Sequence, residues 1–164
     1  MLDLSIFCPQ THAMDLTTYL HRLLLAIACG VVIGLEREWR NKAAGLKTNT
    51  LVAVGSAIYV MLGQALIREG HDDVTRVLGQ VVVGVGFLGA GVILRAGGSV
   101  HGLNTAATVW VTASIGCMVG FGWIWPPLIS ALLIVLINIL MHFIEELFDR
   151  RNAVNREIKN KENI

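Results

Sequence analysis

Three long stretches without a charged residue constrain this 164-residue chain more than any other feature. They cover residues 48–67, 77–94 and 96–144, which are 20, 18 and 49 residues long. Apolar stretches of about 10–14 residues are typical of buried core helices, whereas uncharged stretches of about 18 or more are typical of transmembrane helices. The composition agrees, because 54% of the residues are hydrophobic and only 15% are charged.

The stretch of 49 residues is too long for one membrane crossing, and its sequence indicates where it divides. Pro126 and Pro127 cannot continue a helix but suit the first turn of a new one. Trp123 and Trp125 are typical of an aromatic belt at the membrane interface. All the apolar stretches are continuous, whereas strands of a membrane barrel alternate in polarity, so helices are predicted throughout.

These features predict an all-α fold, a polytopic membrane bundle of five transmembrane helices. A disordered leader over 1–15 precedes the bundle, and a charged cytoplasmic tail over 147–164 follows it. Asn104 is expected to cap the fourth helix. Arg22, the one charge in the first span, is expected to extend to the membrane interface. The expected spans are about 16–35, 48–67, 77–95, 104–122 and 126–146.

The distribution of Lys and Arg predicts how the chain is oriented in the membrane. With the N-terminus outside, ten Lys and Arg residues fall on the inner side and three on the outer side. The positive-inside rule therefore favours an N-out, C-in arrangement. The net charge of only +1 argues against nucleic acid as a partner, since phosphate binding needs clustered positive charge.

A glycine-rich motif, Gly84-Val-Gly86-Phe-Leu-Gly89, matches the dinucleotide-binding pattern but lacks its context. That fold needs an acidic residue about 20 positions later, and the next acidic residue here is Glu145. We interpret these glycines as helix-packing residues, because small residues let membrane helices approach closely. The alternative is that they break the third span and expose its backbone to a cavity. The predicted packing residues are Gly34, Gly79, Gly84, Gly86, Gly89, Gly91 and Gly116.

Polar residues gather where the first span ends and where the second and fourth begin. Glu36 and Arg37 lie at the first of these places, and odd-numbered spans end on the side where even-numbered spans begin. We therefore predict a shared polar pocket on the inner side, with two ordinary helix caps as the alternative reading. Gln80 and Asn138, within spans, predict interhelical hydrogen bonds. The predicted pocket residues are Glu36, Arg37, Lys47, Thr48, Asn49, Arg95, Asn104, Thr105 and Thr108.

Residues that would carry catalysis are not evident. The sequence offers no combined nucleophile, base and metal-ligand set, so we expect neither an enzyme nor a bound cofactor. His71, Asp72 and Asp73 form a small cluster in the outer loop. Two adjacent carboxylates are weak evidence for a divalent cation, because magnesium needs rigid octahedral oxygen geometry. Whether a metal binds is left open.

Four ordered segments resemble the MgtC/SapB family of bacterial inner-membrane proteins over about residues 17–143. The resemblance implies a multi-pass protein of the inner membrane that acts in adaptation to low magnesium and, in some pathogens, in virulence. It also implies action through other membrane proteins, including ion-motive ATPases. Many members carry a cytoplasmic C-terminal domain, so this chain resembles a short form without it. The segments are 34–40 (GLEREWR), 44–49 (AGLKTN), 86–91 (GFLGAG) and 102–110 (GLNTAATVW).

Two classes of function are consistent with the sequence. In the first, small-residue helix faces bind other inner-membrane proteins or a second copy of the chain, and the protein regulates its partner. In the second, the polar pocket is part of an ion path through a small transporter or channel. Transporters usually place charged groups near the bilayer midplane and contain repeated halves. Neither feature is evident here, so the sequence favours the regulator.

Overall fold

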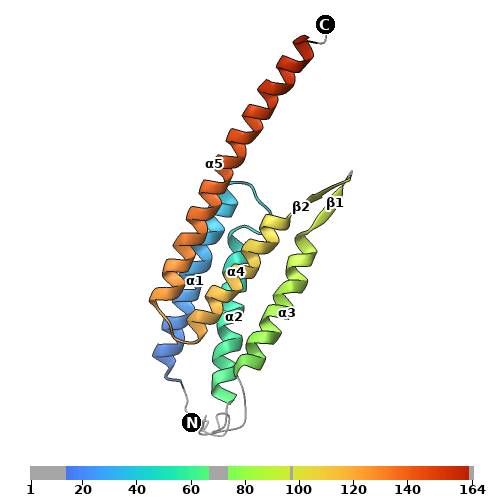
Figure 1. Cartoon of the computed structure of the whole chain (residues 1–164). Helices are drawn as coiled ribbons and strands as arrows, with labels where there is room; N and C mark the ends of the chain where they lie inside the picture. The colour runs from blue at the N-terminus through green and yellow to red at the C-terminus, as the bar shows by residue number, and fades with distance from the viewer. Residues whose placement is uncertain (1–13, 67–73, 97, 163–164) are drawn as a thin grey trace.

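The computed structural model describes residues 14–66, 74–96 and 98–162, which form five helices and a short β-hairpin (Figure 1). Each of the five helices contains a stretch long and apolar enough to cross a membrane. This confirms the predicted all-α, five-helix architecture. Most of the predicted leader lies outside the described residues. The elements are α1 (Leu16–Trp39), α2 (Leu46–Leu66), α3 (Val74–Val92), β1 (Leu94–Ala96), β2 (Ser99–His101), α4 (Leu103–Gly120) and α5 (Trp125–Glu162).

The core of the bundle lies among α1, α2 and α4. The closest packing joins α1 to α2 and α2 to α4 (Figure 1). Helix α3 packs against α4 and α2, and α5 packs against α1 and α4. The buried share of the apolar stretch is 56% in α4 and 11% in α5. Helix α4 is therefore the central element, and α3 and α5 have most of their surface available to lipid.

Close backbone approaches hold this centre together. A Cβ atom on Gly34 would lie 2.6 Å from the Cα of Leu46, and one on Gly120 would lie 2.7 Å from the Cβ of Val60. A Cβ on Gly116 would overlap the carbonyl oxygen of Ala53. Lipid supplies no hydrophobic force between helices, so these approaches gain the van der Waals contact on which membrane bundles depend.

The glycines of α3 behave differently from those of the centre. Gly89 lies beside Ala106 of α4, and a Cβ built on it would be 3.6 Å from the Ala106 Cβ. For the other predicted packing glycines of α3, the described residues place no heavy atom within 4 Å of a built Cβ. They include Gly84, which lines the space between α2 and α3. These residues are Gly79, Gly84, Gly86 and Gly91.

The connection between α3 and α4 is a short β-hairpin. Strands β1 and β2 pair in antiparallel register, with Arg95 opposite Val100. Gly98, which precedes β2, has a φ of +87°. Tight hairpin loops favour glycine because their turns need positive φ. The hairpin extends beyond the end of α3 (Figure 1).

The two ends of α4 are completed by different groups. Its N-cap is Gly102, with a φ of +91°, so Asn104 is not the cap. At its other end lies Arg22 of α1. Its Nη1 donates to the carbonyl oxygen of Gly120 at 2.7 Å and to Oε1 of Gln64 at 3.1 Å. The last carbonyls of a helix lack partners within that helix, so Arg22 satisfies one of them and ties α1 to α2 and α4.

Helix α5 begins at Trp125, as the two prolines predict, but it does not end near residue 146. It continues as helix to Glu162 and extends past the rest of the bundle (Figure 1). Its apolar part ends at Phe148. The predicted tail is thus a continuation of the last helix over its described residues.

Candidate functional site

Arg37 is the buried charge at the end of α1. Only 2% of the residue is exposed, although a guanidinium cannot shed its charge in a protein. Its Nη2 donates to the hydroxyl of Thr105 on α4 and to the carbonyl oxygen of Ala43 at 3.4 Å. Its Nε is buried without a partner. Arg37 therefore links the end of α1 to the start of α4 and keeps one unused donor.

Asn49 plays the corresponding role between α2 and α4. It is completely buried, and its Nδ2 donates to the carbonyl oxygens of Ala44 at 2.6 Å and Gly45 at 3.0 Å. Its Oδ1 lies 3.0 Å from the hydroxyl oxygen of Thr112. The same hydroxyl lies 2.9 Å from the carbonyl oxygen of Thr108, and its one hydrogen can serve only one acceptor at a time.

Glu36 faces a different neighbour from Arg37. Its Oε1 lies 2.8 Å from Nε of Arg40, and its Oε2 accepts from Nδ2 of Asn138 on α5 at 3.2 Å. The carboxylate is nearly buried, since 7% of its side chain is exposed. Three helix pairs thus meet through polar side chains. We call this set the polar cluster; its members are Glu36, Arg37, Arg40, Asn49, Thr105, Thr112 and Asn138.

The turn between α1 and α2 supports the polar cluster. Ala44 has a φ of +54°, a conformation that side chains other than glycine rarely adopt. Its carbonyl accepts from Asn49, and the neighbouring carbonyl of Ala43 accepts from Arg37. Glu38 accepts from the backbone N–H of Leu46 at 3.1 Å and so supports the start of α2. The strained turn is therefore held by side chains from both helices it joins.

Not every predicted pocket residue joins this arrangement. Glu36, Arg37, Asn49 and Thr105 do. Buried Thr108 lies beside them, and its hydroxyl donates to the carbonyl oxygen of Asn104 at 2.9 Å. The side chains of Asn104 and Arg95 are exposed. Lys47 and Thr48 line a separate groove between α2 and α3.

Three members of the polar cluster are not among the predicted pocket residues. Asn138 is predicted only to form an interhelical hydrogen bond, and Arg40 has no predicted role in the pocket. Thr112 was not singled out. A signal for it existed, because Thr105, Thr108 and Thr112 recur at the spacing of one helical face.

Metal ligation is not supported within the described parts of the chain. Over those residues, no group of three or more His, Cys, Asp and Glu side chains is arranged to hold a metal ion. His71, Asp72 and Asp73 lie outside the described residues. The chemistry that the polar cluster offers is instead a buried cationic site, which holds the guanidinium groups of Arg37 and Arg40 and one carboxylate that pairs with Arg40.

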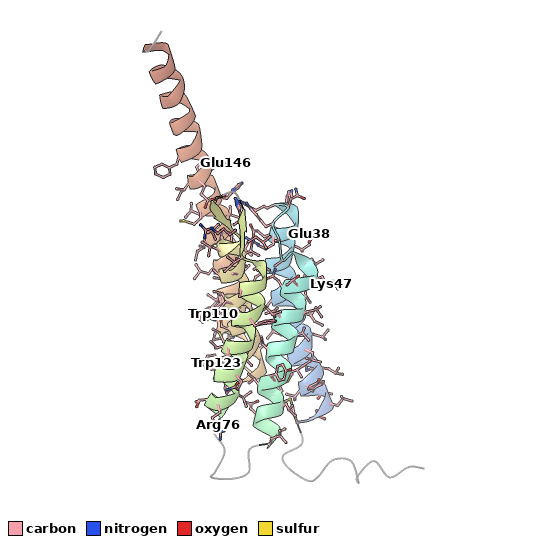
Figure 2. The ribbon with its side chains drawn as sticks, turned by 90° about the vertical axis from the view of Figure 1, so that its right-hand side faces the viewer. Glu38, Lys47, Arg76, Trp110, Trp123 and Glu146 are labelled. Atoms are coloured by element: carbon pink, nitrogen blue, oxygen red, sulfur yellow. The ribbon has the colours of Figure 1, made fainter. Side chains whose placement is uncertain are left out.

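The polar cluster lies at the end of the bundle where α1 ends and α2 and α4 begin. We call this the basic end, because it carries Arg37, Arg40, Lys42, Lys47 and Arg95. Figure 2 shows Lys47 and Glu38 toward this end and Arg76 at the opposite one.

Comparison with known proteins identifies the family. Residues 23–147 match the MgtC family. The chain belongs to the MgtC family. Protein MgtC of Salmonella typhimurium is 45% identical over 123 residues, which are 75% of this chain and 52% of that protein. Protein MgtC of Brucella abortus is 45% identical over 116 residues, 71% of this chain and 48% of that protein. An uncharacterized protein of Synechocystis is 41% identical over 129 residues, 78% and 54% of the two chains.

This MgtC-family chain spans about half the length of the curated relatives it matches. No solved structure shows a significant match to it. The matched region holds all five apolar stretches except the first residues of α1 and the last of α5, and it includes the whole polar cluster. The chain is therefore a multi-pass membrane protein of this family.

Proposed function

We propose that this chain is a regulatory protein of the bacterial inner membrane that binds other membrane proteins through the outward side of α3. The family resemblance implies that the regulated process is adaptation to low magnesium, with a link to virulence in some relatives. The interaction is helix against helix in lipid. The chain needs no catalytic step and no cofactor for this role.

The observation that carries this proposal is an open face of small residues on α3. Gly79 and Gly86 are seven residues apart and share one side of the helix with Ala90. Neither glycine has a heavy atom within 4 Å of a built Cβ, and Ala90 is exposed. Val83 and Phe87 beside them are 68% and 82% exposed. We call these five residues the outer face of α3. Such a face allows a partner helix to approach closely.

The test combines function with assembly. A strain lacking the gene is complemented with wild-type protein, Gly86→Leu or the matched control Gly91→Leu, and grown at low magnesium. Gly91 lies on the same helix about 140° around its axis at 100° per residue, and it also has open space. We expect Gly86→Leu to accumulate normally but to fail in growth and in co-purification of its partner. Full function of Gly86→Leu would contradict the proposal.

A second copy of the chain is the alternative occupant of the outer face. Cross-linking between cysteines introduced at Val83 in a cysteine-free background distinguishes the two. Self-linked dimers that Gly86→Leu abolishes would indicate a homodimer. A link only to another membrane protein would support the hetero-complex.

The second candidate function is a small ion transporter or channel that uses the polar cluster. The observation in its favour is the burial of Arg37, Asn49 and Thr112 between three helices. Against it, the core below the cluster consists of fully buried apolar side chains such as Ile33, Ala57 and Ile115. Ion flux into liposomes above the level of empty vesicles, lost in Asn49→Leu, would favour the transporter.

We further propose that the basic end faces the cytoplasm, which makes the chain N-out and C-in. The support is the concentration of Lys and Arg at that end. A reporter fused after residue 160 should be cytoplasmic, and one inserted in residues 68–76 should be outside. Both reporters on one side of the membrane would contradict this orientation.

A further inference from the structure

We propose that the groove between α2 and α3 binds an anionic phospholipid, with an acyl chain between the helices and the phosphate beside Lys47. This groove is separate from the polar cluster and from the outer face of α3. The proposal therefore does not depend on the proposed regulatory function.

The groove is at least as long as one membrane leaflet is deep. On α2 its lining runs along one helical face from Lys47 to Tyr59, and on α3 from Val77 to Leu88. Twelve residue steps of a helix cover about 18 Å, and half of a bilayer core is about 15 Å thick. A groove that begins at the basic end can therefore hold an acyl chain over the depth of one leaflet.

Its volume is sufficient for a lipid chain. The cavity measures about 670 Å³ and lies between facing sides of α2 and α3. Ligand pockets in proteins measure about 300–1,000 Å³, so a flexible hydrocarbon chain can lie in a space of this size.

Two glycines keep the groove open. Gly55 of α2 and Gly84 of α3 both line it, and a Cβ built on either has no heavy atom within 4 Å. The walls between the ends are otherwise mainly aliphatic and include Leu51, Val81 and Leu88. A flexible hydrocarbon chain is the ligand that such walls accommodate.

Charge complementarity identifies the headgroup. Of the described residues that line the groove, Lys47 alone carries a charge, and the hydroxyl of Thr48 lies next to it in sequence. The polar side chains of Tyr59 and Gln80 line the other part of the groove. One basic mouth and a deep apolar wall match the geometry of a phospholipid, and basic pockets between membrane helices select anionic headgroups.

The experiment is native mass spectrometry of the detergent-purified full chain, titrated with phosphatidylglycerol or with phosphatidylcholine of identical acyl chains. We expect phosphatidylglycerol to bind more tightly, and Lys47→Gln to reduce that preference about fivefold, since one basic residue contributes about 1 kcal/mol to anionic lipid binding. Gly84→Leu, which fills the groove, should weaken both lipids. Lys42→Gln is the matched control for charge, and it should bind as the wild type does.

Three results would overturn the proposal. The first is equal affinity for the two lipids in the wild type. The second is unchanged binding in Gly84→Leu, with Gly55→Leu as a second groove-filling variant should Gly84→Leu fail to fold. The third is a dimer that Gly84→Leu converts to a monomer, because that would assign the groove to a second copy of the chain.

Discussion

Glycine residues in the central helices and in α3 have opposite surroundings. In α1 and α4, Gly34 and Gly116 lie where any side chain would collide with a neighbouring backbone. In α3, Gly79 and Gly86 have open space beside them. A glycine in a membrane helix therefore marks a potential close approach, and only the surrounding fold determines whether this chain itself occupies it.

The two regions also differ in how polar groups are treated. The centre buries Asn49 and Thr112 completely and bonds them to each other. The described part of α3 exposes Gln80 along a lipid-sized groove. We therefore expect the centre to be rigid, whereas α3 presents surface that lipid or another protein can contact. Four substitutions test this contrast.

The largest effect should come from Gly116→Leu. The Cβ alone would overlap the carbonyl oxygen of Ala53, so α2 and α4 must separate along their whole contact. Overpacking costs about 1–3 kcal/mol where side chains can move, and here the obstacle is backbone. We expect no folded protein after membrane extraction, measured by gel-filtration yield. A normal yield would show that the centre is not rigid.

Glu36→Ala should have the next largest effect. It leaves the buried guanidinium of Arg37 and the partly exposed Arg40, whose side chain is 22% exposed, without the one carboxylate of the polar cluster. Removing one partner from a buried charged set costs about 3–5 kcal/mol, and the partial exposure of Arg40 puts the expected loss near the lower value. The measurement is unfolding by denaturing detergent, followed by circular dichroism. Lys42→Ala, an exposed change at the same end, should be silent.

The sequence predicts the helices of this protein well and their mutual contacts poorly. Uncharged stretches locate α2 and α3 because lipid excludes charge over the full membrane thickness. The hydrogen bond between Asn138 and Glu36 joins residues 102 positions apart, so no local pattern can reveal it. The sequence does not reveal the acceptor of Arg22 for a similar reason. This acceptor is the carbonyl oxygen of Gly120 at the end of α4, and it is defined only when the helices are packed.

The candidate site was predictable in part, because the end of α1 and the starts of α2 and α4 must lie on the same side of the membrane. Helix order alone places Arg37, Asn49 and Thr105 at the same end of the bundle. It does not determine the direction of each side chain around its helix. Lys47 and Asn49 are two residues apart on α2, about 200° around its axis, and they accordingly face the groove and the polar cluster.

Asn49→Ala should have a moderate effect on the centre. The carbonyls of Ala44 and Gly45 lose a donor, and the Thr112 hydroxyl loses an acceptor. Each unsatisfied buried group costs about 1–3 kcal/mol, and relaxation of the turn offsets part of the total. We expect a loss of about 2 kcal/mol in the same unfolding assay. Thr112→Val removes only the bond to Asn49 from this set and should cost about half as much. The carbonyl oxygen of Thr108, which also lies beside this hydroxyl, keeps its backbone hydrogen bond within α4.

The smallest effect should come from Gly86→Ala, and its sign is informative. A methyl group at this position meets no heavy atom within 4 Å, so nothing in the chain has to move. Alanine also favours a helix over glycine by up to about 1 kcal/mol. The free energy of unfolding should therefore stay the same or rise slightly.

The matched change Gly34→Ala places the same methyl group 2.6 Å from the Cα of Leu46 and should lower the free energy of unfolding. Unfolding of both variants side by side measures the contrast directly. Equal losses would mean that α3 is packed as tightly as the centre, and the outer face of α3 would then be unavailable to a partner.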